Sequence, residues 1–185
     1  MNRRLFLTAA LALAAAACDR GTSVAQPPAA APPADPSAVP ANPPEDPQNP
    51  LAITARDYMA RNGRAEGVTT LPSGVQYKVL RSGAATGGRP SPQDEVKVHY
   101  SGSLTDGAVF DSSFSRGVPA VMPLDQLIPA WQEVLPLMRP GDDWIVTVPP
   151  AQGYGPEGRP PTIPPYSVLT FRLILLDFLP RTGNA

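Results

Sequence analysis

The sequence predicts an α+β domain in which short antiparallel strands pack against one short helix. Three observations support this fold class. From Val68 onward, short segments alternate apolar and polar residues, glycine and proline separate these segments, and a single later segment repeats its apolar residues every three or four positions. One helix on an antiparallel sheet is a two-layer arrangement, and the roughly 115 residues after Gly67 are enough to enclose one hydrophobic core.

The chain begins with a segment typical of export, "MNRRLFLTAALALAAAAC" at residues 1–18. Two arginines precede an apolar run from Leu5 to Ala17 that is too short to span a bilayer, which predicts a secretory signal peptide. The arginine pair also resembles a twin-arginine export signal, so general and twin-arginine export both stay open. We therefore expect the mature protein to work in the cell envelope, facing the periplasm.

Whether the mature protein would be attached to a membrane depends on Cys18, the only cysteine. The run "AAAAC" resembles a bacterial lipoprotein cleavage site, which makes Cys18 the candidate lipid-attachment residue, although Ala15 stands where leucine is usual. The alternative is cleavage after Ala25, which would remove Cys18 and release a soluble periplasmic protein. A single cysteine excludes an intrachain disulfide in either case.

Residues 19–50 predict a disordered linker. Ten of the 26 prolines lie between Gln26 and Pro50, among alanine, asparagine and acidic residues that offer almost nothing to bury. Such a composition favours extended polyproline conformations over a packed core. A tethered domain needs a long spacer of this kind, which favours the lipid-anchored form.

Residues 51–65 predict a short amphipathic helix. Apolar residues recur there at helical spacing, and glycine follows at Gly63; these apolar residues are Leu51, Ala55, Tyr58 and Met59. A helix of this length is marginal in water by itself. We therefore expect it to dock on the domain or on a partner.

Four segments then predict strands with one buried face, at 73–83, 94–104, 143–149 and 168–179. The residues predicted to face the core are Val75, Tyr77 and Val79 in the first, Val96, Val98 and Tyr100 in the second, Trp144, Val146 and Val148 in the third, and Leu169, Phe171, Leu173 and Leu175 in the fourth.

Segment 124–138, "LDQLIPAWQEVLPLM", predicts the single helix of the domain. Its apolar residues recur at three and four positions, and these are Leu127, Trp131, Val134, Leu135 and Met138. Pro129 suits a first helical turn, and Pro136 marks the limit of the helix.

Composition excludes several classes of function. A net charge of −1 with no basic patch excludes a nucleic-acid partner. The single histidine, His99, falls on the strand face opposite Tyr100, as expected of a solvated or capping residue rather than a general base. No serine is accompanied by a histidine and an acidic residue that could complete a catalytic triad, which argues against a hydrolase. One histidine and one cysteine supply no metal cluster, so we expect neither a metal nor another cofactor.

The segment "AQGYGPEGRPPTIPPYSVLTF" at 151–171 is too rich in proline and glycine to form a helix or a strand. It predicts a stiff loop that holds Tyr154 and Ile163 at a surface. Other apolar side chains could converge with them: Tyr100, Phe110, Trp131 and Phe171. Periodicity does not decide whether these residues are core or pocket, and Asp111 could equally cap the amides of a turn.

At these residues the sequence resembles the FKBP-type peptidyl-prolyl cis-trans isomerases. The motifs HYSG, FDSS, IPAWQEVL, GYG and IPPYSVLTF occur in the order of that family. The resemblance implies a domain at 66–180, followed by a tail at 181–185. The leader, the linker, the short helix and "EGVTTLPSGVQYKVL" resemble the envelope branch that includes the macrophage infectivity potentiator proteins.

The resemblance implies a five- to six-stranded antiparallel half-barrel wrapped around one short helix, with the active site between them. It assigns catalytic roles to Tyr100, Phe110, Asp111 and Tyr154, and substrate-binding roles to Leu127, Ile128, Trp131, Ile163 and Phe171. Trp131 would form the floor beneath the proline ring. Tyr154 and the backbone amide of Ile128 would donate hydrogen bonds to substrate carbonyls.

The implied function is peptidyl-prolyl cis-trans isomerisation in exported proteins, without covalent or acid–base chemistry. The alternative is a proline-recognising envelope chaperone or adaptor with little catalysis. The family's macrocyclic inhibitors would share the pocket, and "PAVMP" at 119–123 leaves their affinity open because many eukaryotic members carry a second phenylalanine there. With the linker in place of a long helical region, we expect a monomer whose partners are unfolded, proline-containing envelope proteins.

Overall fold

The computed structural model describes residues 46–180. The predicted signal peptide, Cys18, most of the predicted linker and the tail at 181–185 lie outside the described residues. Within residues 46–180, no helix has both the length and the apolar character needed to cross a membrane.

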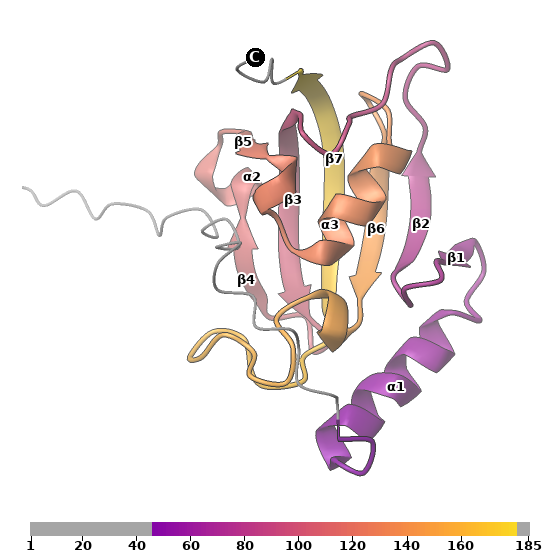
Figure 1. The fold of residues 1–185 in the computed structure, drawn as a ribbon, viewed down its shortest axis with the longest axis vertical. Coiled ribbons are helices and arrows are strands. Elements are labelled where there is room, and N and C mark those ends of the chain that lie inside the picture. Colours follow the sequence, from indigo (N-terminus) through magenta and orange to yellow (C-terminus); the bar gives the residue numbers. More distant parts are fainter. Residues whose placement is uncertain (1–45, 181–185) are drawn as a thin grey trace, which may run out of the picture.

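All strands belong to one antiparallel sheet with the order β1-β2-β6-β7-β3-β4 (Figure 1). The strands are β1 (Val68–Thr70), β2 (Gln76–Arg81), β3 (Glu95–Leu104), β4 (Val109–Ser112), β5 (Ala120–Pro123), β6 (Asp143–Val148) and β7 (Leu169–Leu179). β7 pairs with the whole of β3 along one edge, so β4 and β5 share the other edge of β3. The α+β class is confirmed.

The sheet has seven strands, where five to six were expected. The additional strands are short: β1 has three residues and β5 has four. Segments of this length show too few alternations for a pattern to emerge. Both are peripheral, since β1 pairs only with β2, and β5 only with β3.

Helix α3 (Pro129–Val134) lies across one face of the sheet (Figure 1). It begins at Pro129 as predicted, but its α-helical part is shorter than the apolar pattern of 124–138. Two single turns of 3₁₀ helix flank it, at Leu124–Gln126 and Leu135–Leu137. Pro136 explains the second, because proline has no backbone N–H and so cannot continue the α-helical hydrogen bonds. The sheet face beneath α3 is the core face.

The predicted core faces of β3, β6 and β7 are confirmed, since every named residue on them is buried. The prediction for β2 is wrong at Val79, which is 42% exposed, although Val75 is fully buried. The pairing of β2 with β6 shifts register between Val79 and Arg81, so the alternation is lost there. Tyr77 is half-buried and stacks on Trp144, with ring centroids 4.5 Å apart.

Helix α1 (Pro50–Asn62) begins where Asn49 accepts a hydrogen bond from the amide of Leu51 at 2.9 Å. The expected docking on the domain is present: the Asn62 side chain donates to Gln76 at 2.8 Å, and Gln76 donates to the Met59 carbonyl at 2.8 Å. The prediction of a buried Leu51 is wrong, since this side chain is 51% exposed. The smaller Ala52 and Ala55 are buried instead.

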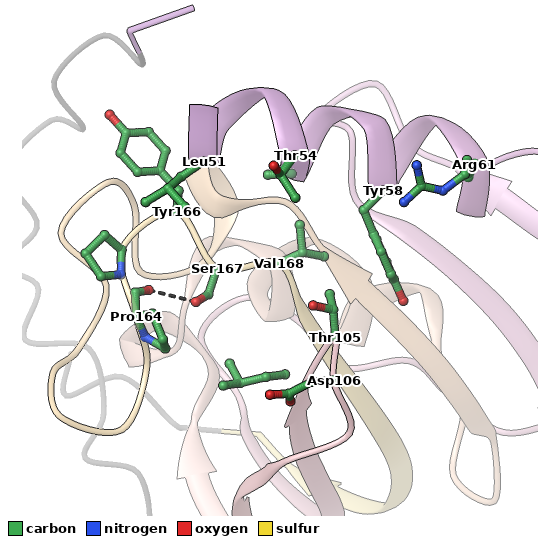
Figure 2. Close-up of a pocket in the computed structure, with 13 residues that line it drawn as sticks. Leu51, Thr54, Tyr58, Arg61, Thr105, Asp106, Pro164, Tyr166, Ser167 and Val168 are labelled. Atoms are coloured by element: carbon green, nitrogen blue, oxygen red, sulfur yellow. Dashed lines mark hydrogen bonds between the residues drawn. The ribbon is translucent and has the colours of Figure 1, made fainter. Parts of the chain in front are cut away.

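A groove of about 430 Å³ separates α1 from the loop that leads into β7 (Figure 2). Leu51 and Tyr58 of α1 line one side, and Pro164 to Val168 line the other. The loop is braced there by the Ser167 hydroxyl, which donates to the Pro164 carbonyl at 2.7 Å. The same loop carries Tyr154 and Ile163, so the groove lies between α1 and the end of that loop.

A short helix, α2 (Ser113–Arg116), connects β4 to β5. Ser112 caps it by accepting from the amide of Ser115 at 3.3 Å. Ser112 is thus the residue that caps the Ser115 amide at this turn.

Candidate functional site

Four aromatic rings from four different elements meet between α3 and the sheet. Trp131 of α3 lies edge-to-face with Tyr100 of β3 and with Phe171 of β7, at centroid distances of 5.2 and 5.3 Å. Phe110 of β4 lies edge-to-face with Phe171 at 5.7 Å. Such pairs are favourable because the positive ring edge meets the negative ring face. We call these four residues the ring cluster.

The four rings of the cluster differ in how deeply they are buried. Tyr100, Trp131 and Phe171 are nearly inaccessible, with exposed fractions of 2%, 4% and 3%, whereas Phe110 is half-buried. Periodicity left open whether these rings are core or pocket, and their burial answers this question for three of the four. The three deep rings belong to the hydrophobic core, and Phe110 lies between that core and the surface.

Asp111 joins the ring cluster through its hydrogen bonds. Its Oδ2 accepts from the Tyr100 hydroxyl at 2.5 Å, and its Oδ1 is paired with Arg116 at 2.5 Å. Arg116 also donates to the Tyr100 oxygen at 3.0 Å. The sequence analysis missed Arg116, and the available signal was an arginine five residues after a carboxylate, across a short turn. Asp111 is thus a charge held at the edge of an apolar cluster.

Burial, reinforced by the hydrogen bond to Asp111, raises the pKa of Tyr100 from 10.0 to about 12. In the unfolded chain the phenol ionises near its ordinary value. Between these two values the unfolded chain releases this proton while the folded protein keeps it, so stability falls as pH rises through the interval. Below the ordinary value the contribution is fully retained.

We expect the titration of tyrosinate absorbance in the folded protein to include the ionisation of one phenol at about pH 12. The difference between the titration curves of the wild-type protein and the Tyr100→Phe variant isolates it. A difference curve centred near the ordinary phenol value would contradict the burial and hydrogen bonding described here.

Tyr154 and Ile163 reach the cluster from the loop between β6 and β7. Ile163 is buried, and Tyr154 is half-buried against the same apolar residues. Burial raises the pKa of the Tyr154 phenol, so this hydroxyl is a neutral donor near neutral pH. The predicted loop is therefore present between β6 and β7, with Ile163 in the hydrophobic core and Tyr154 packed against that core.

Leu127 and Ile128 lie just before α3 and are both buried. The carbonyl of Ile128 accepts from the amide of Trp131 at 2.9 Å, which begins the helix. Among the backbone-to-backbone hydrogen bonds of residues 46–180 outside helices and strands, the amide of Ile128 is not a donor. An amide of this kind is a donor that a ligand carbonyl could satisfy.

The predicted site residues are therefore brought together at one place. Most belong to the core cluster or pack on it, and Asp111 joins it through Tyr100: Tyr100, Phe110, Asp111, Leu127, Ile128, Trp131, Tyr154, Ile163 and Phe171. Their catalytic and binding roles remain predictions. Cys18 lies outside the described residues.

Gly102 of β3 is a site residue that the sequence analysis did not single out, although it lies within the HYSG motif. A Cβ atom at this position would lie 2.6 Å from Phe110 Cζ and 2.7 Å from Phe171 Cε1. Real Cβ atoms do not approach other atoms so closely, so the two rings can meet only because residue 102 has no side chain.

We expect Gly102→Ala to displace Phe110 and Phe171 and to lower stability by about 1–3 kcal/mol, the usual cost of overpacking. Chemical denaturation measures the stability loss, and the near-ultraviolet circular dichroism of the aromatic rings reports their displacement. Gly107→Ala is the control for backbone strain without a clash: its φ is 90°, but a Cβ there meets nothing within 4 Å, so this variant should leave the aromatic dichroism unchanged. Unchanged aromatic dichroism in Gly102→Ala would contradict the packing argument.

His99 is separate from the ring cluster. Its Nδ1 lies 3.0 Å from Ser113 Oγ, and its ring stacks on Phe114 at 4.8 Å. His99 is therefore half-buried between Ser113 and Phe114, where a solvated or capping residue was expected. Among residues 46–180, no group of three or more histidine, cysteine or acidic side chains is placed to hold a metal ion.

The comparisons with known proteins agree with this geometry. Residues 87–176 match the family described as FKBP-type peptidyl-prolyl cis-trans isomerase, and residues 46–79 match the domain found amino-terminal to it. A solved peptidyl-prolyl cis-trans isomerase from Pseudomonas syringae pv. tomato superposes with a TM-score of 0.66 at 32% identity, covering 70% of this chain and 94% of that chain.

Two curated relatives are longer than this chain. The FKBP-type 22 kDa peptidyl-prolyl cis-trans isomerase of Escherichia coli is 44% identical over 129 residues, which cover 70% of this chain and 62% of the relative. The outer membrane protein MIP of Legionella longbeachae is 41% identical over 120 residues, covering 65% of this chain and 51% of the relative. The matched part thus spans between half and two thirds of these relatives.

The family matches, the solved structure and the ring cluster all point the same way, and we conclude that this chain belongs to the FKBP-type peptidyl-prolyl cis-trans isomerase family.

Proposed function

We propose that this protein accelerates rotation about Xaa-Pro peptide bonds in exported polypeptides. The observation that carries the proposal is the ring cluster together with Tyr154: a largely buried apolar group in which only Phe110 and Tyr154 are half-buried, with the Tyr154 hydroxyl as a neutral donor and no nucleophile or general base among its members. Rotation breaks no covalent bond, so such a surface is sufficient in principle.

The barrier explains why apolar surroundings help. Unassisted rotation about Xaa-Pro takes tens to hundreds of seconds, because amide resonance raises the barrier to about 20 kcal/mol. Water stabilises the polar planar amide, and that resonance is lost when the bond twists. Transfer of the bond to an apolar site removes this stabilisation of the planar form and therefore favours the twisted form.

The required lowering of the rotational barrier is of a plausible size. Acceleration to milliseconds corresponds to four or five decades, or about 6 kcal/mol. Shape fit to the twisted bond, together with hydrogen bonds made only in that state, can supply an amount of this order. In this proposal Trp131 supports the proline ring, and Tyr154 and the Ile128 amide donate to the substrate carbonyls.

A protease-coupled assay on an Xaa-Pro peptide tests the proposal. We expect the purified protein to accelerate cis-to-trans rotation, and Tyr154→Ala to lower kcat/KM about tenfold or more while reducing stability less, because this side chain is half-buried. Full activity in Tyr154→Ala would refute the assigned role of the residue. Peptide binding without acceleration by the wild-type protein would refute the catalytic proposal and support the proline-recognising adaptor instead.

We propose further that the protein works in the cell envelope as a lipid-anchored monomer. The export signal, Cys18 and the proline-rich linker support this location, as does the similarity to a relative named an outer membrane protein. Mass spectrometry of the mature N-terminus distinguishes acylated Cys18 from cleavage after Ala25. Equilibrium sedimentation of residues 19–185 distinguishes a monomer from a dimer.

A further inference from the structure

A gap in strand pairing lies beside Tyr100 on β3. On one edge of β3, β4 pairs with residues 101–103 and β5 pairs with residues 95–98, so neither strand pairs with His99 or Tyr100. In an antiparallel ladder, the N–H and C=O of one residue point to the same neighbour, and those of Tyr100 point into this gap. Because Tyr100 is buried, these two backbone groups need a partner other than a strand.

The Ser113 hydroxyl takes the place of the missing strand. Ser113 is the first residue of α2 and is completely buried. Its Oγ accepts from the Tyr100 amide at 2.8 Å and donates to the Tyr100 carbonyl at 3.2 Å. One side chain therefore satisfies both backbone groups of Tyr100.

His99 completes the hydrogen bonds of the same hydroxyl. Its Nδ1 lies 3.0 Å from Ser113 Oγ. A hydroxyl has one proton and two lone pairs. The proton goes to the Tyr100 carbonyl and one lone pair accepts from the Tyr100 amide, so the second lone pair must accept from His99. This arrangement places the imidazole proton on Nδ1.

The turn that contains Ser113 also holds the other end of Tyr100. The phenol hydroxyl donates to Asp111 at 2.5 Å, and its oxygen accepts from Arg116 at 3.0 Å. Residues 111–116 thus bond the backbone of Tyr100 through Ser113 and its phenol through Asp111 and Arg116. A shift of the Tyr100 backbone relative to this turn would therefore disturb both hydrogen bonds of the phenol, and also the edge-to-face contact with Trp131 at 5.2 Å.

We propose that Ser113 is a positioning residue for catalysis: its hydroxyl fixes the Tyr100 backbone to α2 and thereby holds the phenol against Asp111 and beside Trp131. This inference rests on the proposed isomerase function, in which Tyr100 has a catalytic role. Since Ser113 is completely buried, it acts through Tyr100 and not on the substrate.

Double-mutant kinetics on the full chain test the proposal. We expect Ser113→Ala to lower kcat about tenfold with a smaller change in KM, because a small misplacement of a site group can slow catalysis by up to about a hundredfold. Ser113→Thr, which keeps the hydroxyl, should recover most of this loss. In the Tyr100→Phe background, Ser113→Ala should have little further effect on kcat, since no phenol hydroxyl remains to be positioned.

The matched control is Ser112→Ala, which removes the neighbouring hydroxyl from the same turn. The Ser112 hydroxyl accepts from the Ser115 amide at 3.3 Å, whereas that of Ser113 bonds the backbone of Tyr100. Ser112→Ala should lose stability through the missing cap but keep most of its kcat at temperatures where it is folded. Equal losses of kcat in Ser112→Ala and Ser113→Ala would show that loosening of the turn is sufficient and would overturn the proposal.

Equal losses from Ser113→Ala in the wild-type and Tyr100→Phe backgrounds would also overturn the proposal, as would full activity of Ser113→Ala. Nitrogen-15 NMR of His99, the only histidine of the chain, tests the hydrogen bonds independently of activity. We expect the neutral ring of the wild-type protein to carry its proton on Nδ1, because the hydrogen bonds of the ring set its tautomer.

A neutral His99 ring with its proton on Nε2 would turn the Ser113 proton toward His99 and away from the Tyr100 carbonyl, and would overturn the proposal. A wild-type protein that carries the proton on Nδ1 but has no isomerase activity would instead refute the proposed function on which the inference rests.

Discussion

Replacing Trp131 by alanine is expected to cost about 3–5 kcal/mol of stability and to lower kcat/KM by at least a hundredfold, the largest combined effect of any single change in the site. The indole is 4% exposed and is the common edge-to-face partner of Tyr100 and Phe171. Its removal opens a cavity beneath the proposed substrate position, leaves Tyr100 without this ring partner and leaves Phe171 with Phe110 alone. Denaturant unfolding and the peptide assay measure the two effects separately.

A matched control separates loss of the site from loss of the fold. Leu135→Ala removes a fully buried side chain just after α3 but outside the ring cluster. We expect this variant to lose a few kcal/mol of stability and to keep most of its kcat/KM at temperatures where it is folded. If the two variants lost activity in proportion to their stability, Trp131 would have no special role in the site.

Replacing Asp111 by leucine is expected to have the second largest effect. The carboxylate and the Arg116 guanidinium are both largely buried, with side-chain exposures of 11% and 14%. Removing the carboxylate leaves a cation without its partner and the Tyr100 hydroxyl without its acceptor. Breaking a buried pair from one side costs about 3–5 kcal/mol, and the displaced Arg116 should disturb the adjacent ring of Tyr100, over which its guanidinium lies.

The double variant Asp111→Leu with Arg116→Met tests this explanation. Removing both charges eliminates the unpaired cation, so the double variant should be more stable than Asp111→Leu alone. Denaturant unfolding of the two single variants and the double variant completes the cycle. Additive losses would show that the two side chains do not act as a pair.

The sequence predicts the core well where strands are long and lie under α3. On β3 and β7, alternation identifies the buried residues because one face of each strand meets the helix and core and the other meets solvent. The method fails at Val79, where a register shift interrupts the alternation, and at Leu51, where Ala52 and Ala55 make the closer approach instead. The alternation of apolar and polar residues indicates which face of a strand is apolar. It does not reveal a local register shift, nor which residues of a helix pack closely.

The site was predictable as a set of residues but not as a network. The family motifs place Tyr100, Trp131 and Tyr154 together, whereas Arg116 belongs to no motif that marks a role. Its partners are a phenol and a carboxylate brought close by a turn, and turn geometry is not encoded in hydrophobic periodicity. Gly102 was missed for a related reason, since what matters there is the absence of a side chain between two rings.

Catalysis by an apolar site requires no proton transfer, and the pH dependence of kcat/KM in light and heavy water tests this requirement most directly. We expect kcat/KM for an Xaa-Pro peptide to stay constant from about pH 6 to about pH 9, with equal values in the two solvents, because no acid or base ionises in the step. A bell-shaped pH profile together with slower turnover in heavy water would show that a proton moves in the rate-limiting step and would contradict the proposed mechanism.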